Sequence, residues 1–192
     1  MGELDRIKWD QRYREGDRVH DGAPSWLLER WLPLFPKGKA LDVACGLGRN
    51  ALFLAQHGFE VDAVDISSVA IEEASRRALS AGLHIHFVAA DLDTYPLPDG
   101  TYDLVVNTYF LKRDLIPSLK RALKPGGFIV FETHVRSEEE VFGPKEPAHL
   151  LEPNELLHLF WDFHILFYEE TLEEEGKRRQ AVARLVARKV RS

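Results

Sequence analysis

The chain of 192 residues contains little cysteine, methionine, asparagine or glutamine. Its single cysteine, Cys45, excludes an internal disulfide framework and any zinc site made of several cysteines, so we expect a cytoplasmic protein. The sequence has one methionine, three asparagines and three glutamines beside many Glu and Arg residues. Because this composition avoids thermolabile side chains, we also expect a thermophilic source.

The sequence also lacks a long apolar segment and an excess of positive charge. No run approaches the roughly eighteen apolar residues of a membrane span, and the charged N-terminal segment is unlike an export signal. The formal net charge is −6, whereas nucleic-acid phosphates are held by clustered cations, so we expect neither a membrane nor a nucleic acid as partner. The basic residues from Lys177 to Arg191, Arg184 among them, alternate with apolar ones and are interpreted as the solvated face of a strand.

Hydrophobic periodicity predicts an α/β fold. Strand-like and helix-like segments alternate at short intervals, which is the pattern of a parallel sheet covered by helices, and the length fits one hydrophobic core. The last two strands are expected to pair antiparallel across the charged connection 170–177. The predicted strands are 39–44, 60–65, 84–90, 102–108, 128–134, 163–169 and 179–189, and the predicted helices are 4–15, 26–35, 49–57, 69–80, 113–123 and 153–160.

A glycine-containing turn follows the first predicted strand. Leu41–Gly48 ends a buried strand and opens a helix, which is where ligand sites form in open α/β sheets. Gly46 and Gly48 let a ligand approach the backbone without meeting a Cβ atom, and the free N–H groups of the first helical turn can bind a carboxylate or a phosphate. On its own, the turn is a weak signal, and a purely structural role is the alternative.

Acidic residues end the next two predicted strands. Asp65 ends the second strand, where a carboxylate can bind both hydroxyls of a ribose. Asp91 ends the third, where a carboxylate can accept a hydrogen bond from an adenine amino group. Either acid alone could instead cap a helix or fill a turn. Together with the glycine turn, they favour an adenosine-containing ligand that lies across three consecutive strand ends.

These residues resemble the class I S-adenosylmethionine-dependent methyltransferases. Asp42–Gly48 is similar to the glycine-rich first motif of that family, and Asp65 and Asp91 are similar to the acids that follow it. The resemblance is nearest to the tellurite-resistance and thiopurine-methyltransferase-like branch and extends over nearly the whole chain. The segments that carry it are Trp9–Tyr13, Cys45–Ala51, Tyr109–Pro117 and Leu123–Gly127.

The resemblance implies a Rossmann-like three-layer α/β/α sandwich whose seven-stranded sheet has the order 3-2-1-4-5-7-6, with only strand 7 antiparallel. It implies S-adenosylmethionine as cofactor, S-adenosylhomocysteine as product, and a small-molecule acceptor such as a thiol or a tellurite- or selenium-type anion. We expect a single domain, 1–192, in a monomer or homodimer. Its parts would be an N-terminal helical lid at 1–36, cofactor-binding β/α units at 37–134, and an acceptor-side loop, helix and strand pair at 135–192.

The resemblance also implies which residues contact the cofactor. Asp65 and the adjoining Ile66 would lie at the ribose, Asp91 and Leu92 at the adenine, and Asn107 near the sulfonium. Trp9 and Tyr13 would belong to the lid, and the methionine moiety would face the first motif with Asn50. The residues assigned to the lid and the first motif are Trp9, Tyr13, Asp42, Ala44, Cys45, Gly46, Gly48 and Asn50.

The sequence departs from the family pattern at two places. Ala44 stands where many relatives have glycine, which is tolerated if the backbone φ angle there is negative. The stretch Asn107–Phe110 reads Asn-Thr-Tyr-Phe and lacks the Asn/Asp-Pro-Pro-aromatic signature of enzymes that methylate exocyclic amines. Methylation of DNA amines is therefore not expected.

The acceptor side offers binding candidates but no catalytic residue that can be named. A methyl sulfonium is already electrophilic, so a thiolate or similar anion needs only placement, whereas an alcohol needs a base. Tyr109, Arg113 and His134 follow the fourth and fifth strands and could bind substrate; packing, solvent exposure and hydrogen bonding are their alternative roles. Cys45 is interpreted as apolar packing because no His partner is evident, and the eight histidines show no metal-ligand spacing, so no metal is predicted.

Two other functions remain open beside a small-molecule methyltransferase. A regulatory protein that binds S-adenosylmethionine without chemistry would explain the missing base. A nicotinamide-dependent oxidoreductase would share Gly46–Gly48 followed by Asp65, but Ala51 stands where its third glycine belongs, and Asp91 would have no role.

Overall fold

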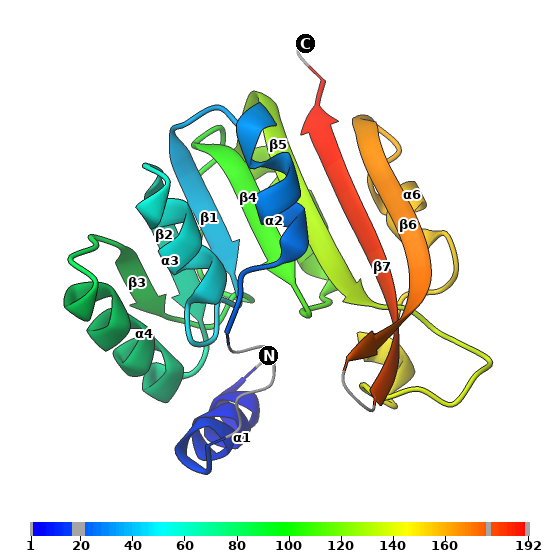
Figure 1. Ribbon diagram of the computed structural model, residues 1–192, viewed down its shortest axis with the longest axis horizontal. Helices are drawn as coiled ribbons and strands as arrows, with labels where there is room; N and C mark the ends of the chain where they lie inside the picture. The colour runs from blue at the N-terminus through cyan, green and yellow to red at the C-terminus, as the bar shows by residue number, and fades with distance from the viewer. Residues whose placement is uncertain (1, 17–21, 176–177, 191–192) are drawn as a thin grey trace.

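The computed structural model describes residues 2–16, 22–175 and 178–190 of the chain. Figure 1 shows one twisted sheet with helices on both of its faces. The strands are β1 (Lys39–Val43), β2 (Glu60–Asp65), β3 (His86–Ala89), β4 (Tyr102–Thr108), β5 (Leu123–His134), β6 (Phe163–Glu175) and β7 (Arg178–Lys189). The helices are α1 (Glu3–Arg14), α2 (Trp26–Trp31), α3 (Arg49–Gln56), α4 (Ser68–Ser80), α5 (Ile116–Ala122) and α6 (Glu155–Leu159), with 3-10 turns at Leu32–Leu34, Arg113–Leu115 and Pro147–His149.

The sheet has the predicted order, β3-β2-β1-β4-β5-β7-β6. The five strands from β1 to β5 are parallel, and β7 is antiparallel to both β5 and β6. The prediction of the fold class and of the single antiparallel strand is confirmed. Because β7 runs in the opposite direction, its first residues lie at the same edge as the last residues of β4 and β5, as in the pairs His134↔Val182 and Glu132↔Arg184.

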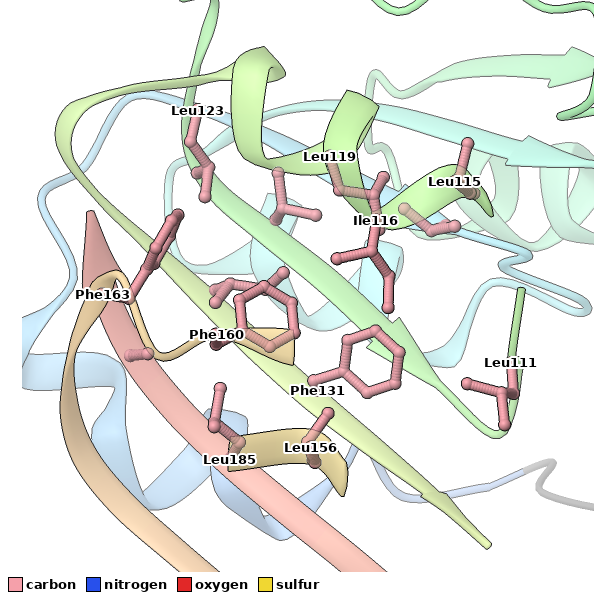
Figure 2. Packing of buried hydrophobic residues seen from close by; sticks show 14 of the residues in the cluster. Leu111, Leu115, Ile116, Leu119, Leu123, Phe131, Leu156, Phe160, Phe163 and Leu185 are labelled. Carbon is pink, nitrogen blue, oxygen red and sulfur yellow. The ribbon is translucent and has the colours of Figure 1, made fainter. Parts of the chain in front are cut away.

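Two apolar layers hold the helices against the sheet. Alternate residues of β1 enter different layers: Leu41 and Val43 pack on the side of α5 and α6, and Ala40 packs on the side of α2 and α3. Figure 2 shows the first layer, where the rings of Phe131 and Phe160 lie 5.8 Å apart between strands and helices. Since both faces of the sheet are covered, its central strands are apolar almost throughout.

Prolines move two helix boundaries away from the predicted ones. The helix expected at 26–35 ends at Trp31 and continues as a 3-10 turn, because Pro33 has no N–H with which to continue the α-helical ladder. The helix expected at 113–123 starts only at Ile116, with Pro117 in its first turn. Proline is tolerated there because the N–H groups of the first turn have no partner within the helix.

The C-terminal hairpin is longer than predicted. Residues 170–175 were expected in the connection, yet they continue β6 and pair with the start of β7. Arg184 was expected on a solvated face, and this prediction is wrong: its side chain is only 4% exposed. The reason is that acidic residues of β6 and β5 surround its guanidinium, so charge pairing replaces solvation. Arg179 and Arg188 on the same strand are exposed, as predicted.

Helix α1 lies beyond the carboxyl ends of the central strands, apart from the helices that cover the faces of the sheet (Figure 1). The loop 135–150 and the turn end of the β6–β7 hairpin reach the same edge. Among the described residues, no helix is both long and apolar enough to cross a membrane. The edge at which the strands β1, β2, β4 and β5 end is therefore the place to look for a ligand site.

Candidate functional site

The glycine turn between β1 and α3 has three residues with positive φ. These are Ala44 at 52°, Gly46 at 53° and Gly48 at 81°. The condition of a negative φ at Ala44 is not met: the turn has the left-handed conformation there, and alanine adopts it at a cost. A Cβ atom on Gly46 would lie 2.7 Å from the hydroxyl oxygen of Tyr13, and one on Gly48 would lie 3.1 Å from the Cβ of Ala74. Both glycines are thus required by close approaches as well as by their backbone angles.

Asp42 lies under this turn at the end of β1. Its Oδ2 accepts a hydrogen bond of 3.0 Å from the backbone N–H of Ala51, which ties the strand to the first turn of α3. Its Oδ1 is buried and has no hydrogen-bond partner among the described residues. Burial raises the pKa of Asp42 to about 7. The side chain therefore retains a buried acceptor, or carries a proton that it can donate.

Asp65 joins the ends of β1 and β2. Its two carboxylate oxygens accept hydrogen bonds of 2.8 Å from the backbone N–H groups of Gly46 and Ser67. Burial raises its pKa, although these two bonds favour the ionised form. Each carboxylate oxygen has two lone pairs, so both retain the capacity to accept a further bond from a ligand hydroxyl.

Helix α1 is held against this region by Asp10. The buried Asp10 accepts hydrogen bonds from the hydroxyl of Ser67, at 2.7 Å, and from the backbone N–H of Val69, at 3.3 Å, so it caps the N-terminus of α4. Burial opposes ionisation, but these bonds and the charges of Arg14 and Arg6 lower its pKa below the usual value. Asp10 belongs to the segment Trp9–Tyr13 that carries the family resemblance, but sequence reasoning assigned no role to it.

The aromatic residues of α1 lie above the glycine turn. The hydroxyl of Tyr13 approaches Gly46, and the ring of Trp9 lies 6.0 Å from that of Tyr13 and beneath the guanidinium of Arg12. Asp10 fixes the same helix to α4, and Tyr13 is the residue of this helix that reaches the glycine turn.

Asp91 and Leu92 follow β3 at the neighbouring strand end. Asp91 is partly exposed, and it shapes a tight turn: its carboxylate accepts from the N–H of Asp93 and its carbonyl from those of Thr94 and Tyr95. Leu92 and Ile66 are buried. The three strand ends that carry the glycine turn, Asp65 and Asp91 are adjacent in the sheet, as the register Asp65↔Ala89 and Val43↔Val64 requires.

The two asparagines assigned to the cofactor site have their amides engaged within the protein. Asn50 accepts a hydrogen bond from the N–H of Ser25 and donates one to the hydroxyl of Thr108, so it joins α3 to the end of β4 and to the segment before α2. Asn107 donates to the carbonyl of Phe110 at 2.6 Å and shapes the turn after β4. Both amides are buried at the edge between the cofactor and acceptor sides.

Tyr109 and His134 lie side by side on the acceptor side, with ring centroids 5.3 Å apart. Tyr109 has a positive φ of 56°. Burial, followed by the charges of Glu132 and Glu173, raises the pKa of its phenol above the usual value, so the hydroxyl stays protonated at neutral pH. Burial lowers the pKa of His134 below the usual value, against a backbone hydrogen bond with Ala181.

Arg113, the third acceptor-side candidate, is directed elsewhere. Its guanidinium makes two hydrogen bonds with the carboxylate of Glu155, at 2.6 and 2.8 Å, and donates to the carbonyls of Ala148 and Leu150. These contacts pin the loop before α6 to the start of α5. Arg113 is therefore left out of the acceptor site proposed below. Cys45 is buried, and burial raises its pKa well above the usual value, which fits its interpretation as packing.

A buried ionic cluster on the acceptor side was missed by sequence reasoning. We call it the Arg184 cluster; it consists of Tyr109, Glu132, Glu169, Glu173, Gln180 and Arg184. Arg184 donates to Glu132 at 2.8 Å, to Glu169 at 3.1 Å and to Glu173, and Ser25 donates to the other oxygen of Glu132 at 2.7 Å. The only signal in the sequence was the high density of Glu in β6, which we had interpreted as a solvated connection.

Comparison with known proteins agrees with this geometry. A protein-family model described as a methyltransferase domain matches residues 40–127. YqeM of Bacillus subtilis, a methyltransferase by name, is 33% identical over 129 residues, which cover 62% of this chain and 52% of that protein. TehB of Haemophilus influenzae, named as an S-adenosyl-L-methionine-dependent methyltransferase, is 28% identical over 165 residues, which cover 79% of this chain and 57% of TehB.

Two solved structures share the fold. The crystal structure of TehB superimposes with a TM-score of 0.77 at 24% identity and covers 94% of this chain and 67% of that one. A Burkholderia thailandensis 1,6-didemethyltoxoflavin-N1-methyltransferase, solved with bound S-adenosylhomocysteine, has a TM-score of 0.77 at 18% identity and covers 97% of this chain and 88% of that one.

The matched methyltransferase domain and the sheet order are those of the class I S-adenosylmethionine-dependent methyltransferases. TehB is similar to this chain in both sequence and fold, in agreement with the resemblance to the tellurite-resistance proteins. The match lends no support to a nicotinamide-dependent oxidoreductase. The chain spans about half the length of the curated relatives it matches.

Proposed function

We propose that the protein transfers a methyl group from S-adenosylmethionine to a small-molecule acceptor. The observation that carries this proposal is the joining of two strand ends by Asp65, which binds the N–H groups of Gly46 and Ser67 and keeps lone pairs for a ribose. An adenosine placed there would extend from the glycine turn toward Asp91 along three adjacent strand ends.

The residues present fit this cofactor. The hydroxyl of Tyr13 can approach the turn because Gly46 has no Cβ, and the buried Oδ1 of Asp42 offers an acceptor without a partner among the described residues. We assign the methionine moiety to Ala44–Gly46, Asn50 and the neighbourhood of Asp42, the ribose to Asp65 and Ile66, the adenine to Asp91 and Leu92, and the sulfonium to the vicinity of Asn107. When bound, the cofactor supplies an electrophilic methyl group.

The protein's own part in the reaction is placement and exclusion of water. Helix α1, fixed by Asp10, covers the glycine turn with Tyr13 and Trp9, and residues 1–36 are proposed as the lid. Tyr109 stays protonated at neutral pH and can donate a hydrogen bond but cannot serve as a base. The family resemblance implies a thiol or a tellurite-type anion, an acceptor that needs orientation more than deprotonation.

Two parts of the chain would bind the two reactants. Residues 37–134 would bind the cofactor, and 135–192 would form the acceptor side, within one domain acting as a monomer or homodimer in the cytoplasm. A nucleic-acid substrate is not proposed, because the net charge is −6.

Isothermal titration with S-adenosylmethionine and S-adenosylhomocysteine tests the proposal. Saturable binding of both, together with transfer of a labelled methyl group to a small molecule of a cell extract, is the expected result. Folded protein that binds neither would refute the assignment of the cofactor site.

A second candidate, a regulatory protein that binds the cofactor without chemistry, is favoured by the high pKa of the Tyr109 phenol, which leaves that hydroxyl unable to accept a proton. The same labelled-methyl experiment separates the two. Cofactor binding without transfer to any small molecule supports the regulator, whereas transfer excludes it.

A further inference from the structure

The Arg184 cluster lies next to the proposed cofactor site. Ser25 connects the two: its N–H donates to Asn50 in the first turn of α3, and its hydroxyl donates to Glu132 in the cluster. Arg49, also in that first turn, lies with its guanidinium 5.8 Å from the centre of the Tyr109 ring. The carboxylates of Glu173 and Glu169 keep 28% and 35% exposure, so a small molecule can reach the cluster from solvent.

Among the described residues, Arg184 and Arg49 lie near this place, and both are engaged. The buried guanidinium of Arg184 is shared among Glu132, Glu169 and Glu173, and it lies over the ring of Trp26. Arg49 donates to the carbonyl of Ala23. Three carboxylates surround the single guanidinium of Arg184, and burial lowers the pKa of His134 beside Tyr109. An anionic acceptor would thus meet excess negative charge.

Gln180 supplies the second and independent observation. Its amide nitrogen donates to Glu173 at 2.6 Å and to the hydroxyl of Tyr109 at 3.3 Å. A carboxylate partner accepts only, so the amide cannot be turned around without placing oxygen against oxygen. The Oε1 atom is buried and has no partner among the described residues. Such an atom is costly unless a donor reaches it, so the site calls for a ligand with a hydrogen-bond donor, such as an N–H group.

We propose, on the basis of the methyltransferase function above, that the acceptor is a small alkylamine whose ammonium or amine N–H groups bind Gln180 Oε1 and Glu173. The cluster offers hydrogen-bond acceptors and net negative charge, which is the complement of an amine and the opposite of what an oxyanion needs. This replaces the thiol or tellurite-type anion as the acceptor class. The Asn/Asp-Pro-Pro-aromatic signature that the chain lacks serves exocyclic amines of nucleobases, whose lone pair is delocalised; an alkylamine keeps its lone pair localised.

The chemistry balances without a further reactant. Before transfer, the ammonium loses one proton to water. The neutral nitrogen then uses its lone pair to form the bond to the methyl carbon, the carbon–sulfur electron pair returns to sulfur, and the methylated ammonium is released.

The experiment compares probes of opposite charge on protein saturated with S-adenosylhomocysteine. Titration calorimetry with propylamine, propionate and tellurite gives three dissociation constants. We expect propylamine to bind about tenfold more tightly than either anion, or better. Propylamine that shows no saturable binding, or an anion that binds as tightly, overturns the proposal. Failure of S-adenosylhomocysteine itself to bind would instead refute the proposed function, so the two failures are distinguishable.

Variants locate the binding groups. Gln180→Leu and Glu173→Gln are each expected to weaken propylamine about tenfold while the affinity for S-adenosylhomocysteine is unchanged. Glu139→Gln removes an exposed glutamate that pairs with Arg179 outside the cluster and is the matched control. If Gln180→Leu alters only thermal stability and leaves propylamine binding intact, Oε1 has a structural role and the proposal is wrong. The wild-type probe comparison stands even if a variant fails to fold.

Discussion

The cofactor side and the acceptor side of the sheet edge use buried acids in opposite ways. On the cofactor side, Asp42 and Asp65 bind backbone N–H groups and fix the path of the chain around a turn. On the acceptor side, Glu132 binds side chains, above all Arg184 on a different strand. Acids that bind backbone N–H groups, as Asp42 and Asp65 do, form a site whose shape is set by the local turn. An acid that binds a side chain of a distant strand, as Glu132 does, forms a site whose charge depends on the whole fold.

The largest expected effect is on stability and belongs to the acceptor side. Arg184→Met leaves Glu132 buried without its cation, and breaking a buried pair in this way costs about 3–5 kcal/mol of unfolding free energy. Urea denaturation measures it. The matched control is Arg179→Met, which removes an exposed pair and should cost no more than about 1 kcal/mol. Equal losses in the two variants would mean that the cluster is not the charged core described here.

The next effect belongs to the cofactor side and appears in binding. Asp65→Ala should weaken S-adenosylmethionine by about 1.5–3 kcal/mol, the value of hydrogen bonds to a charged group. Titration calorimetry on protein shown to be folded by circular dichroism gives the answer, with Asp99→Ala, an exposed loop acid, as the control. Unchanged affinity would argue against the ribose assignment.

A smaller effect is expected at the contact between the lid and α4. Asp10→Asn keeps the shape but loses the charge that caps α4, and should weaken cofactor binding by about 1 kcal/mol. Because its pKa is lowered in the folded protein, the contribution of Asp10 to stability is present above the usual carboxylate pKa and is lost as pH falls through the lower folded value. Urea midpoints of the wild type and variant should therefore converge below about pH 4. A difference between the two urea midpoints that persists at acidic pH would show that the charge of Asp10 does not cause the loss of stability.

The smallest expected effect is an increase in stability. Ala44→Gly removes the penalty for a left-handed alanine and should raise the free energy of unfolding by about 0.5–1 kcal/mol, after the entropy cost of glycine. Thermal denaturation detects it, and Ala51→Gly, in the helix that follows, should destabilise instead. A loss of stability at position 44 would contradict the φ angle described here.

The contrast between the two sides also explains what the sequence alone could predict. The glycine turn, Asp65 and Asp91 follow apolar strands at short range, so periodicity found their places, and the family resemblance supplied the strand order. Glu132 and Arg184 are 52 residues apart, and nothing local indicates that they pair. The glutamates of β6 were mistaken for a loop because their charge is neutralised only by a strand that comes later. The φ of Ala44 was missed because alanine gives no local signal of a left-handed backbone.

The position of β7 between β5 and β6 has a consequence for how the protein comes to fold. While the chain is being synthesised, β6 has no neighbouring strand to bond with until β7 has emerged, because the sheet order interposes the later strand between the two earlier ones. The acidic side chains of β6 would keep its unpaired edge solvated and repel other copies of the nascent chain. The glutamates that surround Arg184 in the finished protein would in this way also protect the nascent chain from aggregation.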